Sequence, residues 1–174
     1  MNLFFLDIDP QKSAEYHCNK HVVKMIIEIV QMLYTAHHLN GKELPSNCYR
    51  KLSNHNHPMA IWVRTSKTNY DYTVSLGINL SLEYTYRYNK IHSCDNHLKW
   101  LSENKPNFNN NSIDLTSIPM CMPKECIKVQ GNDIKSAVTN YRNYYIVYKK
   151  TFAKWGPTRI IPWWFYYCDI QKLF

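Results

Sequence analysis

The stretch DPQKSAEYHCNKHVVKMIIEIVQMLYTAHHLNG, residues 9 to 41, decides the fold because both of its ends carry helix signals. Asp9 can cap the first turn, and Pro10 suits the first helical position, where no amide hydrogen is needed. Asn40 and Gly41 form a normal C-terminal signal. Between these ends the apolar residues recur at helical steps of three and four: Ala14, Cys18, Val22, Met25, Ile29, Leu33 and Ala36. The stretch predicts one helix that ends near His38.

The same helical steps recur in the middle of the chain. His57-Pro58 can open a short helix. Thr68, with Asp71 three residues later, approximates a capping box and predicts a helix over residues 69–89. The inward face of that helix should carry four residues at steps of four: Tyr70, Val74, Ile78 and Leu82.

The C-terminal half adds two helices and a loop. A short helix can follow Asp95, and Asp133 can cap a last helix that reaches about residue 155. Residues 105–123 contain three prolines and an asparagine run, follow no period and predict a long irregular loop. Residues 3–6 form a short extended segment ahead of the first helix. These segments predict an all-α fold, with all 174 residues in a single compact helical domain.

The composition favours an anionic partner. The chain carries a formal net charge of +8, and lysines or arginines that neutralise phosphates release counterions, which drives association. Residues 88–174 hold twelve Lys and Arg against six Asp and Glu, so most of the positive charge lies there. No apolar run approaches the roughly 20 residues of a membrane helix, and the N-terminus lacks a basic region ahead of its apolar stretch. We therefore expect no membrane span, no signal peptide and a cytoplasmic location. The six cysteines form no CxxC pair, which favours reduced thiols.

A polar stripe runs beside the apolar face of the first helix: His17, His21, Lys24, Glu28, Gln31 and Thr35. An imidazole, an ammonium group and a carboxylate on successive turns can supply an acid or base, an anion contact and a second base. We predict Glu28 as the catalytic base and His21 as the acid or phosphate donor. The alternative is a solvated face with a Lys24–Glu28 ion pair. His17, Lys20 and Lys24 on one side of the helix favour an anion, and we include them among the phosphate contacts.

Basic and aromatic residues interleave in the two later long helices, a pattern that suits bases stacked beside phosphates. We predict four more ligand-binding residues: Arg64, Tyr84, Arg87 and Arg142. Arginine is favoured because its guanidinium binds phosphate oxygens in a bidentate fork. The alternative is that the tyrosines belong to the core with their hydroxyls in water. No GxGxxG, GxxxxGK[ST], HExxH or GxSxG motif occurs, which removes the common nucleotide-binding and hydrolase assignments.

A zinc site competes for some of the same residues. His17-Cys18-x-x-His21, His92-x-Cys94-x-x-His97 and His55-x-His57 contain residue types that zinc accepts. Their spacing is not that of a standard zinc finger, and Cys18 falls on the apolar face. We predict no metal and no cofactor, and keep a zinc-dependent hydrolase as an alternative.

Four stretches together resemble an uncharacterised family found in phages, large DNA viruses and some bacteria. They are DPQKSAEYHCNKHVVKMIIEIVQML (9–33), NHPMAIWVR (56–64), EYTYRY (83–88) and YRNYYIVYKKTFAKW (141–155), about a third of the chain. The resemblance implies no particular activity. For a viral member the location would be the host cytoplasm.

The chain is more distantly similar to the pyrimidine-dimer DNA glycosylase and abasic-site lyase family of T-even bacteriophage. The likeness lies in size, charge, an opening helix with histidine and glutamate, and an aromatic C-terminus. That similarity implies a sugar attacked by an N-terminal amine, assisted by a glutamate that corresponds approximately to Glu28. The amine differs here, because Asn2 is bulky and we expect Met1 to be retained.

The leading hypothesis is therefore a protein that acts on DNA or a nucleotide, in the manner of a base-excision enzyme. A viral protein that binds and sequesters a phosphorylated nucleotide without turnover is the alternative. The sequence leaves the substrate and the oligomeric state open.

Overall fold

The computed structural model describes residues 1–41, 43–48, 52 and 54–170, and over these residues the protein is a compact all-α domain without strands. The described elements are α1 (Pro10–Tyr16), α2 (Asn19–Leu39), α3 (Pro58–Thr65), α4 (Lys67–Tyr88), α5 (Asp95–Glu103), the 3₁₀ turn η1 (Lys124–Cys126), α6 (Ile134–Tyr148) and α7 (Trp163–Ile170).

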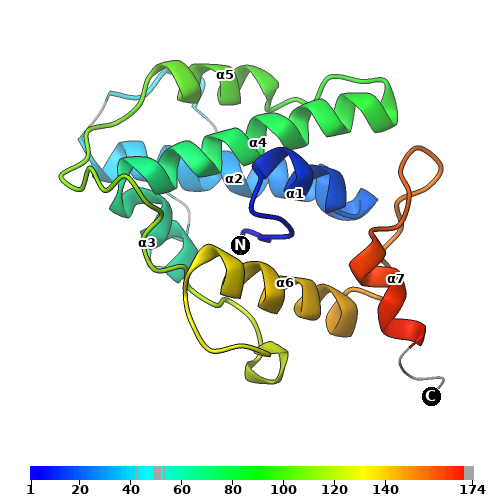
Figure 1. Cartoon of the computed structure of the whole chain (residues 1–174). Coiled ribbons are helices and arrows are strands. Elements are labelled where there is room, and N and C mark those ends of the chain that lie inside the picture. The colour runs from blue at the N-terminus through cyan, green and yellow to red at the C-terminus, as the bar shows by residue number, and fades with distance from the viewer. Residues whose placement is uncertain (42, 49–51, 53, 171–174) are drawn as a thin grey trace.

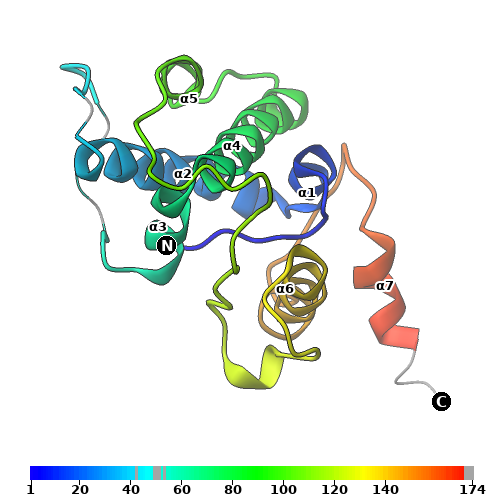
Figure 2. The same ribbon diagram turned by 60° about the vertical axis from the view of Figure 1, so that its left-hand side comes forward.

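The helices form one layer with α6 packed below it. Helices α2 and α4 run side by side, and α1, α3 and α5 each contact α4 (Figure 1). Residues 1–6 pass between this layer and α6 (Figures 1 and 2). The side chains of residues 3–6 are buried there and join the hydrophobic core. The extended N-terminal segment thus lies in the middle of the fold.

The predicted first helix is two helices, because the backbone is extended at His17 and Cys18, with ψ of 135° and 158°. The prediction of one continuous helix was wrong. The C-terminal segment satisfies the backbone groups that the break exposes: Trp155 Nε1 donates to Tyr16 O at 2.9 Å, and the first amide of α2 donates to Lys154 O at 2.7 Å. These partners are distant in sequence, so the local pattern did not reveal the break.

Helix α4 begins two residues earlier than predicted, because Ser66 and not Thr68 caps it: Ser66 Oγ accepts the Asn69 amide hydrogen at 3.1 Å. Leu82 was predicted to face inward but is 62% exposed. In an α-helix a step of four residues overshoots a full turn by about 40°. A ridge at steps of four therefore rotates away from the core, and Leu80 is buried instead.

Helix α6 has the predicted cap, since Asp133 Oδ1 accepts from the amides of Lys135 and Ser136. It ends at Tyr148, earlier than the predicted end near residue 155. After it the chain turns, which brings Trp155 under the α1–α2 break. The predicted long loop is confirmed, because residues 105–123 contain no helix.

Two expectations concern the environment of the protein. Within the described ranges, no helix combines the length and the apolarity that a membrane crossing requires. The five cysteines whose side chains the structure describes are free thiols.

Candidate functional site

A cavity of about 250 Å³ lies between the N-terminal segment, α2 and α6. Its polar lining comes from Asn2, His21, Lys24, Glu28, Tyr144 and Lys149, and we call it the basic cavity. Three of these residues occupy successive turns of α2. The structure therefore brings His21, Lys24 and Glu28 of the predicted stripe to one place.

The Glu28 carboxylate is held from two sides and is only 8% exposed. Its Oε1 lies 3.2 Å from Lys24 Nζ. Its Oε2 accepts the Asn2 amide hydrogen at 2.8 Å and lies 3.6 Å from the amino nitrogen of Met1. Lys24, in contrast, has a side chain that is 64% exposed. The cavity thus has a fixed carboxylate at its wall and an ammonium group that can reach a ligand.

His21 is buried and is held by Tyr145, whose hydroxyl contacts its Nδ1. Burial, reinforced by the positive charges of His17 and nearby lysines, lowers the pKa of His21 to about 3. Burial also raises the pKa of Tyr145 well above its usual value, so its hydroxyl stays protonated. A hydroxyl that donates to Nδ1 leaves the ring hydrogen on Nε2. At neutral pH His21 is therefore a neutral imidazole and not an imidazolium acid, and in the tautomer in which Tyr145 donates to Nδ1 its Nε2 carries the N–H donor.

Phe4, Tyr144 and Lys149 are among the residues of the basic cavity that were not predicted as site residues. The Phe4 ring stacks on His21, with ring centroids 4.7 Å apart. Lys149 Nζ donates to the Tyr144 hydroxyl at 3.0 Å and lies 4.3 Å above the centroid of that ring. The interleaved basic and aromatic pattern contained Tyr144 and Lys149. Nothing in that pattern showed which of its residues face α2.

Lys20 and His17 lie beside this arrangement. Lys20 Nζ is 4.9 Å from the centroid of Phe152, a ring that also contacts His21. His17 is fully buried, and its Nδ1 donates to Ser13 O at 2.7 Å. Burial lowers the pKa of His17 to about 4. His17 therefore belongs to the core beneath the α1–α2 break.

Two of the predicted phosphate-binding arginines are engaged within the protein. The Arg87 side chain is 1% exposed, and its Nε lies 2.6 Å from Glu83 Oε1. Its Nη1 donates to Asn19 Oδ1 at 2.8 Å. Arg142 Nη2 lies 2.9 Å from Asp7 Oδ2, and its Nε donates to a backbone carbonyl of the N-terminal segment. Both guanidinium groups pair with groups of the protein itself, and neither lines the basic cavity.

Arg64 and Tyr84 also lie elsewhere. Arg64 Nη1 donates to His55 O at 2.6 Å, next to α3. The half-buried Tyr84 ring packs against Tyr88 and His92, each with centroids 4.9 Å apart. The structure does not bring these two residues to the stripe of α2.

The proposed zinc ligands are engaged separately. His92 Nδ1 accepts the Cys94 amide hydrogen at 3.1 Å, and His97 Nδ1 pairs with the Tyr34 hydroxyl at 2.9 Å. Cys18 is buried on the apolar face, as expected. In the part of the chain that the structure describes, no three His, Cys, Asp or Glu residues gather in a way that could hold a metal ion.

Comparison with protein-family models, curated proteins and solved structures found no match to this chain. The case for a function therefore depends on the geometry of the site.

Proposed function

We propose that this protein binds a phosphate-bearing nucleotide, free or within DNA, in the basic cavity and cleaves the bond between its base and its sugar. The observation that supports this most is the convergence of Lys24 and Lys149, from two different helices, on Glu28 and His21. Two ammonium groups against one carboxylate leave the cavity positive, which favours an anionic ligand. The Tyr144 ring in the same wall offers an aromatic surface for a base.

In the proposed reaction Glu28 accepts a proton from a water molecule. The water oxygen forms a bond to C1′ of the sugar while the bond from C1′ to the base nitrogen breaks. The electron pair of that bond leaves with the base, which then takes the proton from Glu28. Lys24 and Lys149 bind the phosphate, and neutral His21 donates a hydrogen bond from Nε2 to an oxygen of the ligand.

A second candidate is a protein that sequesters a phosphorylated nucleotide without turnover. The observation in its favour is that both oxygens of Glu28 are already engaged, one by Lys24 and the other by Asn2. A carboxylate with this many partners could serve to position the lysine rather than to accept a proton. The two candidates share the ligand and differ in the role of Glu28.

The test measures base release and binding in parallel, with an ultraviolet-irradiated oligonucleotide, an abasic oligonucleotide and free deoxynucleotides. If Glu28 is the base, Glu28→Gln should reduce turnover roughly 100-fold or more while binding is kept. Lys24→Gln should weaken binding, and Lys99→Gln, an exposed lysine of α5, is the matched control.

Each outcome decides between the candidates. Binding without base release by the natural protein would support sequestration and rule out the enzyme. Absence of binding to any of these probes would exclude both. Trapping of a covalent adduct by borohydride would show that an amine, rather than water, attacks the sugar.

A further inference from the structure

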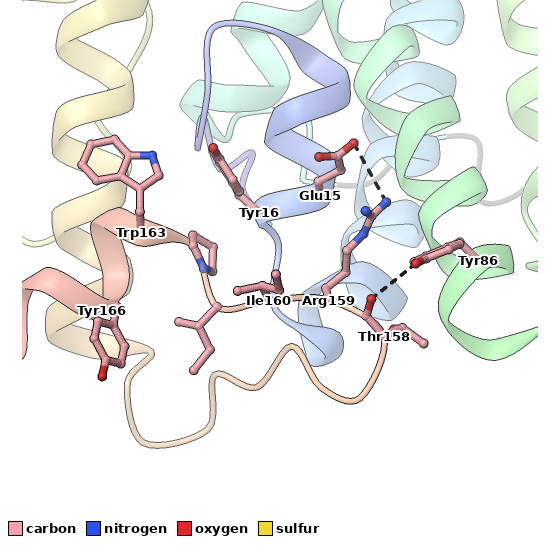
Figure 3. A pocket seen from close by; sticks show the side chains of 10 residues that line it. Glu15, Tyr16, Tyr86, Thr158, Arg159, Ile160, Trp163 and Tyr166 are labelled. Carbon is pink, nitrogen blue, oxygen red and sulfur yellow. Dashed lines mark hydrogen bonds and ion pairs between the residues drawn. The ribbon is translucent and has the colours of Figure 1, made fainter.

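A second hollow, of about 820 Å³, lies between α1, the C-terminal end of α4 and residues 158–166 (Figure 3). We call it the aromatic groove, defined by Glu15, Tyr16, Tyr86, Arg159, Trp163 and Tyr166. It shares no lining residue with the basic cavity. Its volume and its mainly apolar walls are typical of small-molecule sites, which span roughly 300–1,000 Å³.

Three aromatic side chains of the groove remain accessible. Tyr86, Trp163 and Tyr166 are 57%, 59% and 61% exposed. Figure 3 shows Trp163 and Tyr166 on one side of the groove and Tyr86 on the other, with Arg159 between them. Exposed aromatic side chains on both sides of a hollow can bind a flat ring by stacking on it.

Arg159 is held by Glu83 through one edge of its guanidinium group. Its Nε donates to Glu83 Oε1 and its Nη2 to Glu83 Oε2, each at 2.8 Å. The guanidinium carbon lies 4.4 Å from the centroid of the Tyr86 ring. With its Nε–Nη2 edge paired to Glu83, the planar guanidinium of Arg159 can still stack on an aromatic ring.

The charges that line the groove are balanced. Glu15 and Arg159 are its charged residues, and Glu15 Oε1 lies 3.9 Å from Arg159 Nη2. An anionic ligand would meet this carboxylate and, behind Arg159, that of Glu83. A neutral ligand is not repelled by either carboxylate, and Glu15 can accept a hydrogen bond from it.

We propose that the aromatic groove binds a neutral, planar heteroaromatic molecule that carries an N–H donor, the chemistry of a nucleoside base. The ring contacts Trp163 on one side of the groove and the Tyr86–Arg159 pair on the other, and its N–H donates to Glu15. This site is separate from the proposed nucleotide cavity and does not depend on it.

The test uses adenosine as the probe and nuclear magnetic resonance of the indole N–H groups of the whole protein. Adenosine should shift the indole signal that is missing from Trp163→Ala. Because stacking on an aromatic side chain contributes substantially to base binding, Trp163→Ala and Tyr86→Leu should each weaken affinity roughly fivefold or more. N6,N6-dimethyladenosine should bind more weakly, since its amino group has no hydrogen to donate.

Tyr148→Ala is the matched control, because it removes an exposed tyrosine outside both sites and should leave adenosine binding unchanged. Thermal unfolding of each variant checks that it is folded. The proposal is overturned if adenosine at its solubility limit leaves the Trp163 signal unmoved, or if both groove variants bind it as well as the natural protein. Loss of binding in Lys149→Gln would place adenosine in the basic cavity and equally refute the proposal.

Discussion

The basic cavity and the aromatic groove use their cations in opposite ways. In the cavity, Lys24 pairs with the Glu28 carboxylate and projects largely into solvent, and Lys149 lines the same cavity. In the groove, Arg159 has its hydrogen-bonding edge taken up by Glu83. The comparison shows that the availability of a cation for a ligand depends on its partners more than on its type. The arginines, which by geometry suit phosphate better, support the fold, while Lys24 remains accessible.

The largest expected effect on stability is that of removing the Glu83 carboxylate, which pairs with Arg159 of the groove. Glu83 is 4% exposed and pairs with Arg87 and Arg159. Burial alone would raise the pKa of Glu83, but hydrogen bonds from the two arginines outweigh it and lower the pKa. Glu83→Ala should reduce the free energy of unfolding by about 3 to 5 kcal/mol, because buried Arg87 loses its charge partner. Urea denaturation measures this.

A matched control is Asp71→Asn, which removes a more exposed carboxylate that pairs with Lys67 and Lys105. It should cost less than about 1 kcal/mol. Equal losses for the two variants would show that Glu83 is no more important to the fold than a surface carboxylate.

The two faces of α2 provide the next comparison. Ile29 is fully buried and packs on α4 at Gly77. Ile29→Ala should therefore cost about 2 to 5 kcal/mol. Lys24→Gln, on the cavity face, should cost less than about 1 kcal/mol and reduce ligand affinity instead. If both variants lower the melting temperature alike, with no separate loss of binding, the cavity face is structural.

The histidines of the cavity side predict a dependence of stability on pH. The pKa values of His21 and His17 in the folded protein are about 3 and about 4, whereas an unfolded histidine has a pKa of about 6.5. As pH falls below about 6.5, the unfolded chain binds protons that the folded protein does not. Stability is therefore fully present above that pH and declines below it, by up to about 1.4 kcal/mol per pH unit for each histidine.

Urea denaturation between about pH 7 and pH 5, above the range where most carboxylates titrate, measures this dependence. His57, His92 and His97 add to it, because burial lowers their pKa values as well. His21→Gln should reduce the slope, whereas His38→Gln, at an exposed position, should leave it unchanged. A flat profile in the natural protein would contradict the burial of both rings.

The dependence of ligand affinity on salt concentration should differ between the two sites. Affinity of an oligonucleotide for the basic cavity should fall linearly on logarithmic axes as salt rises, and Lys149→Gln should reduce the slope by about one unit. Adenosine affinity for the charge-balanced groove should hardly change. Fluorescence titration at several salt concentrations checks both, with Lys99→Gln as the control. Salt-independent oligonucleotide binding would exclude the electrostatic role of the cavity.

The smallest expected effect is that of a chelator. Because His92 and His97 already have protein partners and His17 lies in the core, a chelator should leave the melting temperature and ligand binding unchanged. Elemental analysis that finds one zinc per chain would reverse this prediction.

The sequence by itself determined the local elements. Asp9 and Asp133 cap their helices as predicted, Asn40 ends α2, and the apolar steps place Met25 and Ile29 in the core. These features depend on residues within a few positions of one another, and such signals are present in the sequence. The same local spacing put His21, Lys24 and Glu28 on one stripe.

Only the tertiary structure decided which polar residues line the basic cavity. The sequence pattern does not distinguish Arg87 from Lys24, since both are charged residues of long helices. In the structure Arg87 is buried against Glu83, whereas Lys24 lines the cavity. The break at His17 depends on Trp155, and the second lysine of the cavity, Lys149, directly follows α6. Contacts between distant segments fix the burial and the hydrogen-bond partners of a charged group, and no local pattern contains that information.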